Sequence, residues 1–382
     1  MNEELYSRSI RLILENQSEW GSYVASPAFP TYQYCWLRDG SFIAHAMDTA
    51  GEVSSATAFF RWAGRTIQKH ADKVDDLRNH LEAGLPVGKD DVLHTRYTLD
   101  GNEVTVDSTW GNFQIDGYGT WLWALARHVH RSQDISLLKE LDEPIQTTLK
   151  YLELVWKLPN YDCWEEHPEF LHPYSLASVF AGFDSMAFLA RSGYMAFESM
   201  AVEGIAGQVK EFILKYGVNG GRLVKHIHPA RPDGPPRPVL KSGVDSSLIG
   251  ISIPYNVLPP DDLIVQATLE AIETDLHRPG GGVYRYKADV FYGGGEWLLL
   301  TAWLGWFYAN TGKIEQAETL CNWIESQANE AGELPEQVSE HTLYSNHFKP
   351  WVNKWGRVAS PLTWSHAVYI ILVNAIKQGK SK

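Results

Sequence analysis

EVSSATAFFRWAGRTIQKH, residues 52–70, is the stretch that decides the fold class. Its apolar side chains Phe59, Phe60, Ala63 and Ile67 recur at spacings of three and four, the period that turns one face of an α-helix toward a core. The same period is found in ten further segments: 3–16, 38–50, 114–131, 135–157, 175–192, 193–216, 261–276, 294–310, 313–330 and 360–378. The sequence therefore predicts an all-α protein built mainly from paired helices.

Local signals support these segments. Asp134 precedes ISLLKEL and Asp261 precedes DLIVQATLEAI, as helix-capping residues do, and Gly312 separates two helical segments. The short apolar stretch SSLIGISI at 246–253 would supply a twelfth helix. Alternation with period two is rare, with GRLVKHIHP at 221–229 the best example, so we expect no large sheet.

Six long polar loops separate the helical segments. They are residues 17–37, 71–113, 158–174, 217–245, 277–293 and 331–359. Loops of this length are uncommon in a compact domain unless they carry function. A ring of paired helices, with its site built from loops at one end, fits this spacing. No linker divides the chain, so we expect residues 1–382 to form a single catalytic domain, with no N-terminal β-sandwich and no starch-binding module.

Composition excludes several classes of protein. The formal charge of −13 disfavours nucleic acid, because binding to phosphates needs clustered Lys and Arg. No apolar run reaches the roughly 20 residues of a membrane span, and the N-terminus lacks a signal peptide, so we expect a cytoplasmic protein. The three cysteines are too far apart in sequence to indicate a disulfide framework. The 15 Trp, 18 Tyr and 14 Phe suit a carbohydrate site, although an aromatic core or a protein interface would give the same count.

The loops carry strings that mix charge with aromatic residues. They are TYQYCWLRDGS (31–41), TWGNFQIDGYG (109–119), NYDCWEEHPEF (160–170), GGGVYRYKADVFYGGGEW (280–297), GELPEQ (332–337) and PLTWSHA (361–367). If these loops meet at one end of a helical ring, they gather two arginines and several carboxylates in one cleft. Inverting cleavage of a glycosidic bond needs two carboxyl groups about 6.5–9.5 Å apart. The neighbours Glu165 and Glu166 cannot span that gap, so the partner has to come from another loop, and Glu336 is the best candidate.

In order and spacing these strings resemble glycoside hydrolase family 15, the glucoamylase-like family, over roughly residues 30 to 370. The matching motifs are YxYxWxRD, WGxxQxDG, DxWEE, RY before an aromatic-Gly segment, an EQ turn and LTWS. The resemblance implies an (α/α)6 barrel and an inverting, exo-acting α-glucosidase that needs no cofactor and releases β-glucose from α-linked glucose oligosaccharides or polysaccharides. The linkage, the natural substrate and the oligomeric state stay open.

The resemblance also implies roles for individual residues. Glu165, the first Glu of DxWEE, falls on the general acid, and Glu336 falls on the general base. The positions that bind substrate in the family fall on Tyr32, Trp36, Arg38, Asp39, Trp110, Glu166, Arg285 and Trp364. We expect Trp164 and its loop to shield Glu165 from water and raise its pKa, and the like charge of Glu166 to act in the same direction.

Several of these residues also have a structural interpretation. Arg38 and Asp39 could be a helix cap with a surface ion pair, and Trp110 and Trp364 could be core residues. No metal site is expected, because His226 and His228 lack a third ligand at suitable spacing. A sugar-binding regulatory protein without turnover, a trehalase of the same family, or another enzyme on the same toroid are the rival functions.

Overall fold

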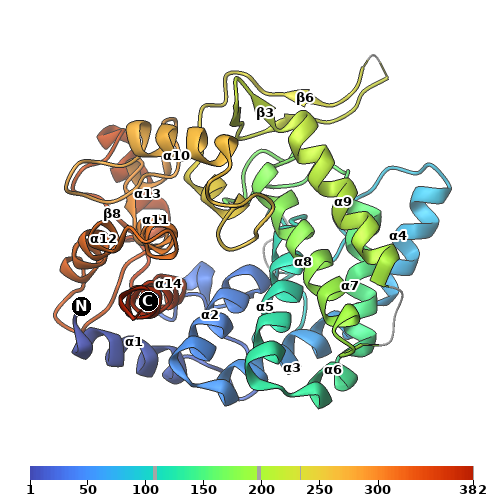
Figure 1. The fold of residues 1–382 in the computed structure, drawn as a ribbon, viewed down its shortest axis with the longest axis horizontal. Coiled ribbons are helices and arrows are strands. Elements are labelled where there is room, and N and C mark those ends of the chain that lie inside the picture. The colour runs from blue at the N-terminus through green and yellow to red at the C-terminus, as the bar shows by residue number, and fades with distance from the viewer. Residues whose placement is uncertain (106–109, 196–198, 233, 382) are drawn as a thin grey trace.

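The computed structural model describes residues 1–105, 110–195, 199–232 and 234–381. Five long helices form an inner ring (Figure 1): α2 (Leu37–Ala50), α5 (Asp116–Ser132), α8 (Pro173–Arg191), α11 (Leu298–Asn310) and α14 (Thr363–Lys380). Contacts run from α14 to α2, α5 and α8, then through the 3₁₀ turn η2 (Ser246–Ile251) to α11 and back to α14. The ring is therefore closed, and η2 takes its sixth position.

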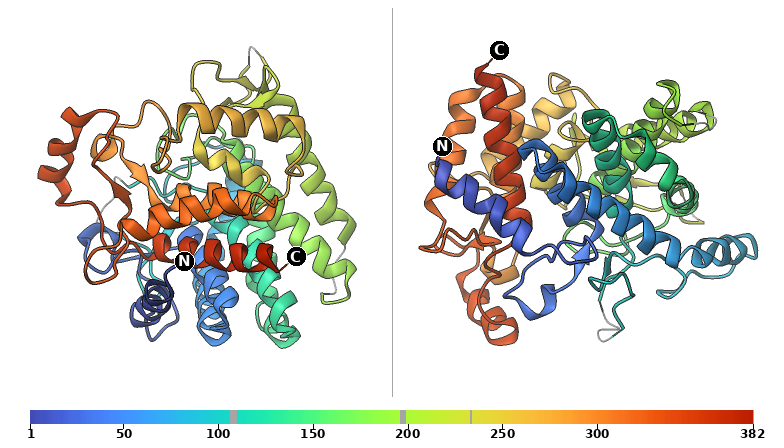
Figure 2. Two further views of the ribbon diagram at one scale, coloured as in Figure 1. Left: turned by 60° about the vertical axis from the view of Figure 1, so that its left-hand side comes forward. Right: turned by 90° about the horizontal axis from the view of Figure 1, so that it is seen from below.

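A second layer of helices surrounds the inner ring and alternates with it along the chain: α1 (Glu3–Glu15), α3 (Val53–Lys69), α7 (Asp142–Val155), α9 (Ser199–Tyr216), α10 (Leu263–Asp275) and α12 (Ile314–Ser326). Six inner and outer pairs make the (α/α)6 barrel that the sequence predicted. The chain travels once around the ring, so that α1 packs on α14 (Figures 1 and 2).

Burial explains which helices lie inside. In α11, LLLTAWLGWFYAN, every residue is buried except Trp306 and Asn310, because neighbouring helices cover it on nearly all sides. The outer helix α3 buries one face, and its Phe59, Phe60 and Ile67 are fully buried as predicted. Helices buried at most of their positions thus form the inner layer, and helices that bury one face form the outer one.

Three helices differ from the prediction. Segment 135–157 is divided into α6 (Ile135–Glu140) and α7, because Pro144 in the first turn of α7 has no N–H to continue α6. Helices α4 (Asp72–Glu82) and α13 (Ser345–Trp355) lie in stretches expected to be loops. Only Val74 and Leu77 are buried in α4, and no residue is buried in α13, although its Phe348, Trp351, Val352 and Trp355 recur at helical spacing.

Segment ends show smaller differences. Asp134 caps α6 by accepting the N–H groups of Ser136 and Leu137, as expected. Helix α10 is capped by Asp262 rather than Asp261. The stretch 246–253 forms a 3₁₀ turn and not an α-helix. Part of the predicted helix 193–216 lies outside the described residues.

Short antiparallel strand pairs tie the long loops together. The pairs are β1 (Cys35–Trp36) with β2 (Arg96–Tyr97), β3 (Val218–Asn219) with β4 (Arg222–Leu223), β5 (Ile227–His228) with β6 (Arg237–Pro238), and β7 (Glu296–Trp297) with β8 (Gln337–Val338). Two further 3₁₀ turns are η1 (Pro30–Tyr32) and η3 (Phe291–Gly293). In the β7–β8 pair, Trp297 is opposite Gln337, which fixes the neighbouring Glu336 at the start of α11. In the described part of the chain no sheet has more than two strands, as expected.

Cys35, Cys163 and Cys321 are buried and unpaired, in agreement with the absence of a predicted disulfide framework. Among the described residues, no helix is both long enough and apolar enough to cross a membrane.

Candidate active site

The N-terminal ends of the inner helices surround a pocket of about 570 Å³. The pocket is lined by all ten side chains predicted for the site: Tyr32, Trp36, Arg38, Asp39, Trp110, Glu165, Glu166, Arg285, Glu336 and Trp364. Arg38 and Asp39 lie in the first turn of α2, Trp364 in the first turn of α14, and Glu165 in the loop before α8. Helix N-termini carry partial positive charge, which suits a site rich in carboxylates.

Arg38 and Asp39 form the buried end of the pocket, which we call its floor, and Arg38 connects this floor to residues of neighbouring elements. Its guanidinium donates to Gln114 Oε1 at 2.9 Å and to Asp116 Oδ2 at 3.1 Å, and it lies 3.9 Å from Glu165 Oε1. The side chain is buried, so this charge needs its carboxylate partners. These bonds join the first turn of α2 to that of α5, which excludes a surface ion pair as the role of Arg38.

The loop of Glu165 is shaped by an aspartate. Asp162 Oδ1 accepts the N–H groups of Trp164 at 3.0 Å and Glu166 at 2.9 Å. Between them Glu165 takes a left-handed conformation with φ of 67°, which costs a non-glycine residue energy and is common at functional sites. The tight turn points Glu165 into the pocket, where its Oε1 accepts the indole N–H of Trp36 at 2.6 Å.

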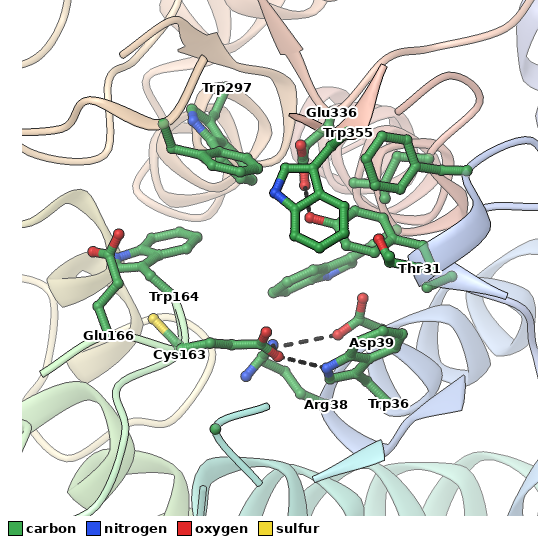
Figure 3. A pocket seen from close by; sticks show the side chains of 18 of the residues that line it. Thr31, Trp36, Arg38, Asp39, Cys163, Trp164, Glu166, Trp297, Glu336 and Trp355 are labelled. Atoms are coloured by element: carbon green, nitrogen blue, oxygen red, sulfur yellow. Dashed lines mark hydrogen bonds and ion pairs between the residues drawn. The ribbon is translucent and has the colours of Figure 1, made fainter. Parts of the chain in front are cut away.

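Glu336 reaches the same pocket from the turn before β8. Its Oε1 accepts the hydroxyl of Tyr32 at 3.2 Å, and its Oε2 is buried without a hydrogen-bond partner in the described part of the chain. The rings of Tyr32 and Trp36 are in edge contact at 5.7 Å, so each carboxyl group is held by one member of an aromatic pair. In Figure 3, Glu336 lies across the pocket from Trp36 and Arg38. The two glutamates therefore share one pocket but are held at different sides of it.

Burial shifts the pKa of both carboxyl groups upward. Desolvation raises the pKa of Glu165, and the Arg38 charge and the Trp36 N–H limit the rise. Desolvation raises the pKa of Glu336 to about 8, against the opposing effects of Arg285 and the Tyr32 hydroxyl. A carboxyl group that keeps its proton near neutral pH can act as an acid, and its conjugate base is stronger than that of an ordinary glutamate.

Glu166 does not act on Glu165 as expected from the sequence. Its carboxylate lies 3.6 Å from the Arg285 guanidinium and accepts the hydroxyl of Tyr286. Burial opposes its ionisation, but Arg285 and Tyr286 outweigh burial and lower the pKa of Glu166. Burial, and not repulsion from Glu166, is therefore what raises the pKa of Glu165. Trp164 contributes to that burial as a wall of the pocket.

Asp39 supplies a third carboxyl group on the floor. Burial raises its pKa to about 7, although Arg38 at 3.5 Å opposes the shift. Its Oδ2 and Arg38 Nε form this ion pair with each other, and neither atom makes a hydrogen bond with the described residues. Buried donors and acceptors without hydrogen-bond partners are costly in a folded protein, so an acceptor and a donor side by side indicate a surface made to bind hydroxyl groups.

The tryptophans predicted as sugar contacts have mixed positions. Trp110 is half-buried, and the Arg96 guanidinium stacks 3.6 Å from its ring. Trp364 is buried, packs against Phe42 and Trp303, and has the Arg38 guanidinium 5.5 Å from its ring. Trp364 is thus both a core residue and part of the pocket wall.

Sequence reasoning did not name several residues that line the pocket: Ala25, Phe29, Thr31, Gly111, Cys163, Phe291, Trp297, Trp351, Lys354, Trp355 and Leu362. Phe291 and Trp297 belong to the string at 280–297. Their position between the RY pair and α11 is a signal that could have identified them as pocket residues. Trp351, Lys354 and Trp355 belong to α13, which lies in a stretch expected to be a loop.

Behind the Glu165 loop, Asp162, His172 and His226 bring potential metal-ligating atoms within 4.8 Å of one another. The third ligand that His226 lacks in sequence is thus supplied by the fold, and its neighbour His228 is not part of this group. His172 Nε2 donates to the Asn160 carbonyl at 2.7 Å, and the Nδ1 atoms of His172 and His226 are hydrogen-bonded at 2.9 Å. Burial lowers the pKa of both imidazoles, so they are neutral. Hydrogen bonding accounts for this cluster as a support of the loop.

The model of the glycosyl hydrolases family 15 matches residues 1–320. An isomaltose glucohydrolase of Kribbella flavida is 36% identical over 375 residues, which cover 98% of this chain and 92% of that protein.

Solved structures give the same result. A glycosidase variant in complex with glucose superposes with a TM-score of 0.90 at 37% identity, covering 98% of this chain and 96% of that one. A bacterial glucoamylase complexed with acarbose shares the fold, with a TM-score of 0.74 at 20% identity over 98% of this chain and 55% of that chain. A chain with this pocket, this barrel and these relatives is a glycosidase, and it belongs to glycoside hydrolase family 15.

Proposed function

We propose that the protein is an inverting, exo-acting α-glucosidase that releases β-glucose from the non-reducing end of short α-linked glucosides. The observation that carries this proposal is the shared pocket of Glu165 and Glu336, in which each carboxyl group is tethered to one ring of the Tyr32–Trp36 pair. The pocket ends at the buried Arg38 and Asp39, and a pocket with a buried end suits the end of a chain better than its middle.

In the proposed reaction, Glu165 donates its proton to the glycosidic oxygen as the bond to the anomeric carbon breaks. Glu336 acts in its ionised form, which is the minority form at pH 7 for a carboxyl group with a pKa of about 8, and takes a proton from a water molecule whose oxygen attacks the anomeric carbon from the opposite face. The configuration inverts, and the two carboxyl groups exchange protonation states. Arg38 and Asp39 would bind hydroxyl groups of the terminal glucosyl unit through their ion-paired Nε and Oδ2 atoms, which make no hydrogen bond with the described residues.

The relative from Kribbella flavida makes isomaltose the first substrate to test. Trehalose is the second, because a trehalase of Thermoplasma acidophilum is 23% identical over 81% of this chain. We also propose that residues 1–382 act as one catalytic domain, because α1 and α14 pack together and complete a single ring.

A panel of isomaltose, maltose, maltooligosaccharides, dextran and trehalose tests the proposal, with the released glucose followed by NMR. We expect β-glucose to appear first. Initial α-glucose would rule out inversion, and no hydrolysis of any substrate would favour a binding protein over an enzyme.

Replacing either glutamate tests the assigned roles. Glu165→Gln and Glu336→Gln should each lower kcat by about 10²-fold or more, because one removes the proton donor and the other the proton acceptor. The exposed Glu330→Gln is the matched control and should keep wild-type kcat. Near-normal turnover of either pocket variant would show that its role is misassigned.

A further inference from the structure

Helix α13 reaches the pocket from outside the barrel. It carries no buried residue, yet Trp351, Lys354 and Trp355 near its end line the same pocket as Glu165 and Glu336. Figure 2 shows the segment at the edge of the molecule, beyond both helical layers. In Figure 3 the ring of Trp355 stands in front of Glu336, on the other side of the pocket from Arg38 and Asp39.

The helix is fixed to the barrel by aromatic contacts with η3. The Trp351 ring lies 5.0 Å from Phe291 in an edge contact and 6.2 Å from Tyr292. The Tyr292 hydroxyl donates to the Gly356 carbonyl at 3.1 Å, directly after the helix. Before the helix, the Tyr344 N–H donates to the Gly293 carbonyl at 2.8 Å. Bonds at both ends and contacts along its length make α13 a fixed wall and not a loose flap.

The pocket residues of α13 and the floor residues Arg38 and Asp39 lie at different ends of the pocket. Arg38 and Asp39 are 4% and 7% exposed and lie at the closed end, whereas Trp355 is half-buried and Lys354 is exposed at the mouth. A glucosyl unit held on the floor, with the scissile bond between the two glutamates, directs its leaving group outward toward the mouth. The Trp355 indole stands in front of Glu336 on the side of the pocket opposite this floor.

Chemistry supports a sugar as the occupant of this space. A flat indole covers the apolar face of a pyranose, and a charged donor beside it binds the hydroxyl groups at the ring edge. Lys354 Nζ lies 4.8 Å from the Trp355 ring and 5.4 Å from the Trp351 ring, and it forms no ion pair with a carboxylate among the described residues. Its donors are therefore free for a ligand at the pocket rim.

We propose that α13, through Trp355 and Lys354, forms the subsite for the leaving sugar and so determines which α-glucosides are cleaved. This inference rests on the proposed function and adds to it the residues that select the sugar beyond the scissile bond.

The test compares isomaltose with α-glucosyl fluoride, which has the same glucosyl unit but no leaving sugar. In Trp355→Ala, the ratio of kcat/KM for isomaltose to that for the fluoride should fall about tenfold, mainly through a higher KM for isomaltose. Trp355→Phe should restore most of the ratio, since it keeps an aromatic face. Lys354→Gln should lower the ratio by a smaller factor.

Trp20→Ala is the matched control, because Trp20 is 52% exposed and does not line the pocket. An unchanged ratio in Trp355→Ala, whether both activities fall together or neither changes, would overturn the proposal. Failure of the wild-type protein to cleave the fluoride would instead overturn the proposed function itself.

Discussion

The position of Glu165 depends on Asp162, a neighbouring residue that does not line the pocket. Asp162 accepts two N–H groups of the loop and holds Glu165 in its left-handed turn. Burial raises the pKa of Asp162 to about 8, although Lys225 opposes the shift, so this carboxyl group is largely neutral at pH 7.

Two substitutions of Asp162 should therefore have clearly different effects on kcat. Asp162→Asn keeps an acceptor oxygen and should retain most of kcat. Asp162→Ala loses both bonds, which frees the loop, and should lower kcat about tenfold or more because the acid is misplaced. Steady-state kinetics at pH 7 measures both. Equal activity of the two variants would mean that the loop does not depend on these bonds.

Glu336 should link the stability of the protein to pH. Its folded pKa of about 8 lies above its ordinary value of 4.5, so the folded state binds this proton more tightly than the unfolded state. The stabilisation from this group is complete below pH 4.5 and is lost as pH rises toward 8. Glu336→Gln has no proton to lose and should be more stable than wild type by up to about 3 kcal/mol at pH 7.

Denaturant unfolding at pH 4.5 and pH 7 measures this difference. We expect it to be present at pH 7 and to disappear near pH 4.5, and Glu330→Gln should show no such dependence on pH. A Glu336→Gln variant that is less stable than wild type at pH 7 would contradict the buried, protonated carboxyl group.

At the scale of elements, α5 and α8 cross so closely that a side chain cannot fit between them. A Cβ added to Gly119 would lie 2.3 Å from the Ser178 carbonyl oxygen, and Gly182 packs against Gly119 from the other helix. The backbones themselves are in contact here, so the spacing of these two inner helices depends on glycine.

Gly119→Ala should destabilise the barrel by about 3 kcal/mol or more, since only a shift of α5 against α8 would relieve the clash. Gly204→Ala in α9 is the control: a Cβ there meets nothing within 4 Å, and alanine favours a helix over glycine by about 1 kcal/mol. Thermal unfolding of both variants separates the close crossing from a general effect of the substitution. A neutral Gly119→Ala would show that the ring can widen.

Which elements the sequence could predict follows from how they are buried. Helices α3 and α11 bury a full face or nearly all sides, and periodicity identified both. Helix α4 buries two residues and α13 none, and the apolar residues of α13, such as Phe348, Trp351 and Trp355, have helical spacing but stand within a long polar segment. Helix α13 is held by Trp351 against Phe291, a contact between segments some sixty residues apart that no local pattern can show.

The candidate site was predicted better than its surroundings for a similar reason. Charged and aromatic residues in short motifs, such as Arg38 with Asp39, identify themselves in sequence. The bonds that orient them do not, because Tyr32 and Glu336 are separated by 304 positions. The sequence also predicted that Glu166 would act on Glu165, and the salt bridge of Glu166 with Arg285 shows why that was wrong.

For the whole molecule, closure of the ring is what makes the pocket possible. Helices α14 and α2 are neighbours although they come from opposite ends of the chain, and their first turns provide Trp364 and Arg38 to one wall. The Lys377–Glu3 ion pair at 3.1 Å also joins α14 to α1. The site is therefore a property of the complete circle, since no single helix pair contains the two glutamates and the arginine.

The reactivity of the three buried cysteines reports how readily this closed ring opens. Burial raises the pKa of each thiol, so the reactive thiolate is scarce even though Cys163 borders the pocket. Ellman's reagent should leave all three unlabelled in the native protein and modify them together once denaturant opens the barrel. Mass spectrometry would count the labels, and early reaction of one thiol would show that the structure opens locally near that residue. Labelling rate would then time the opening of the barrel without any engineered probe.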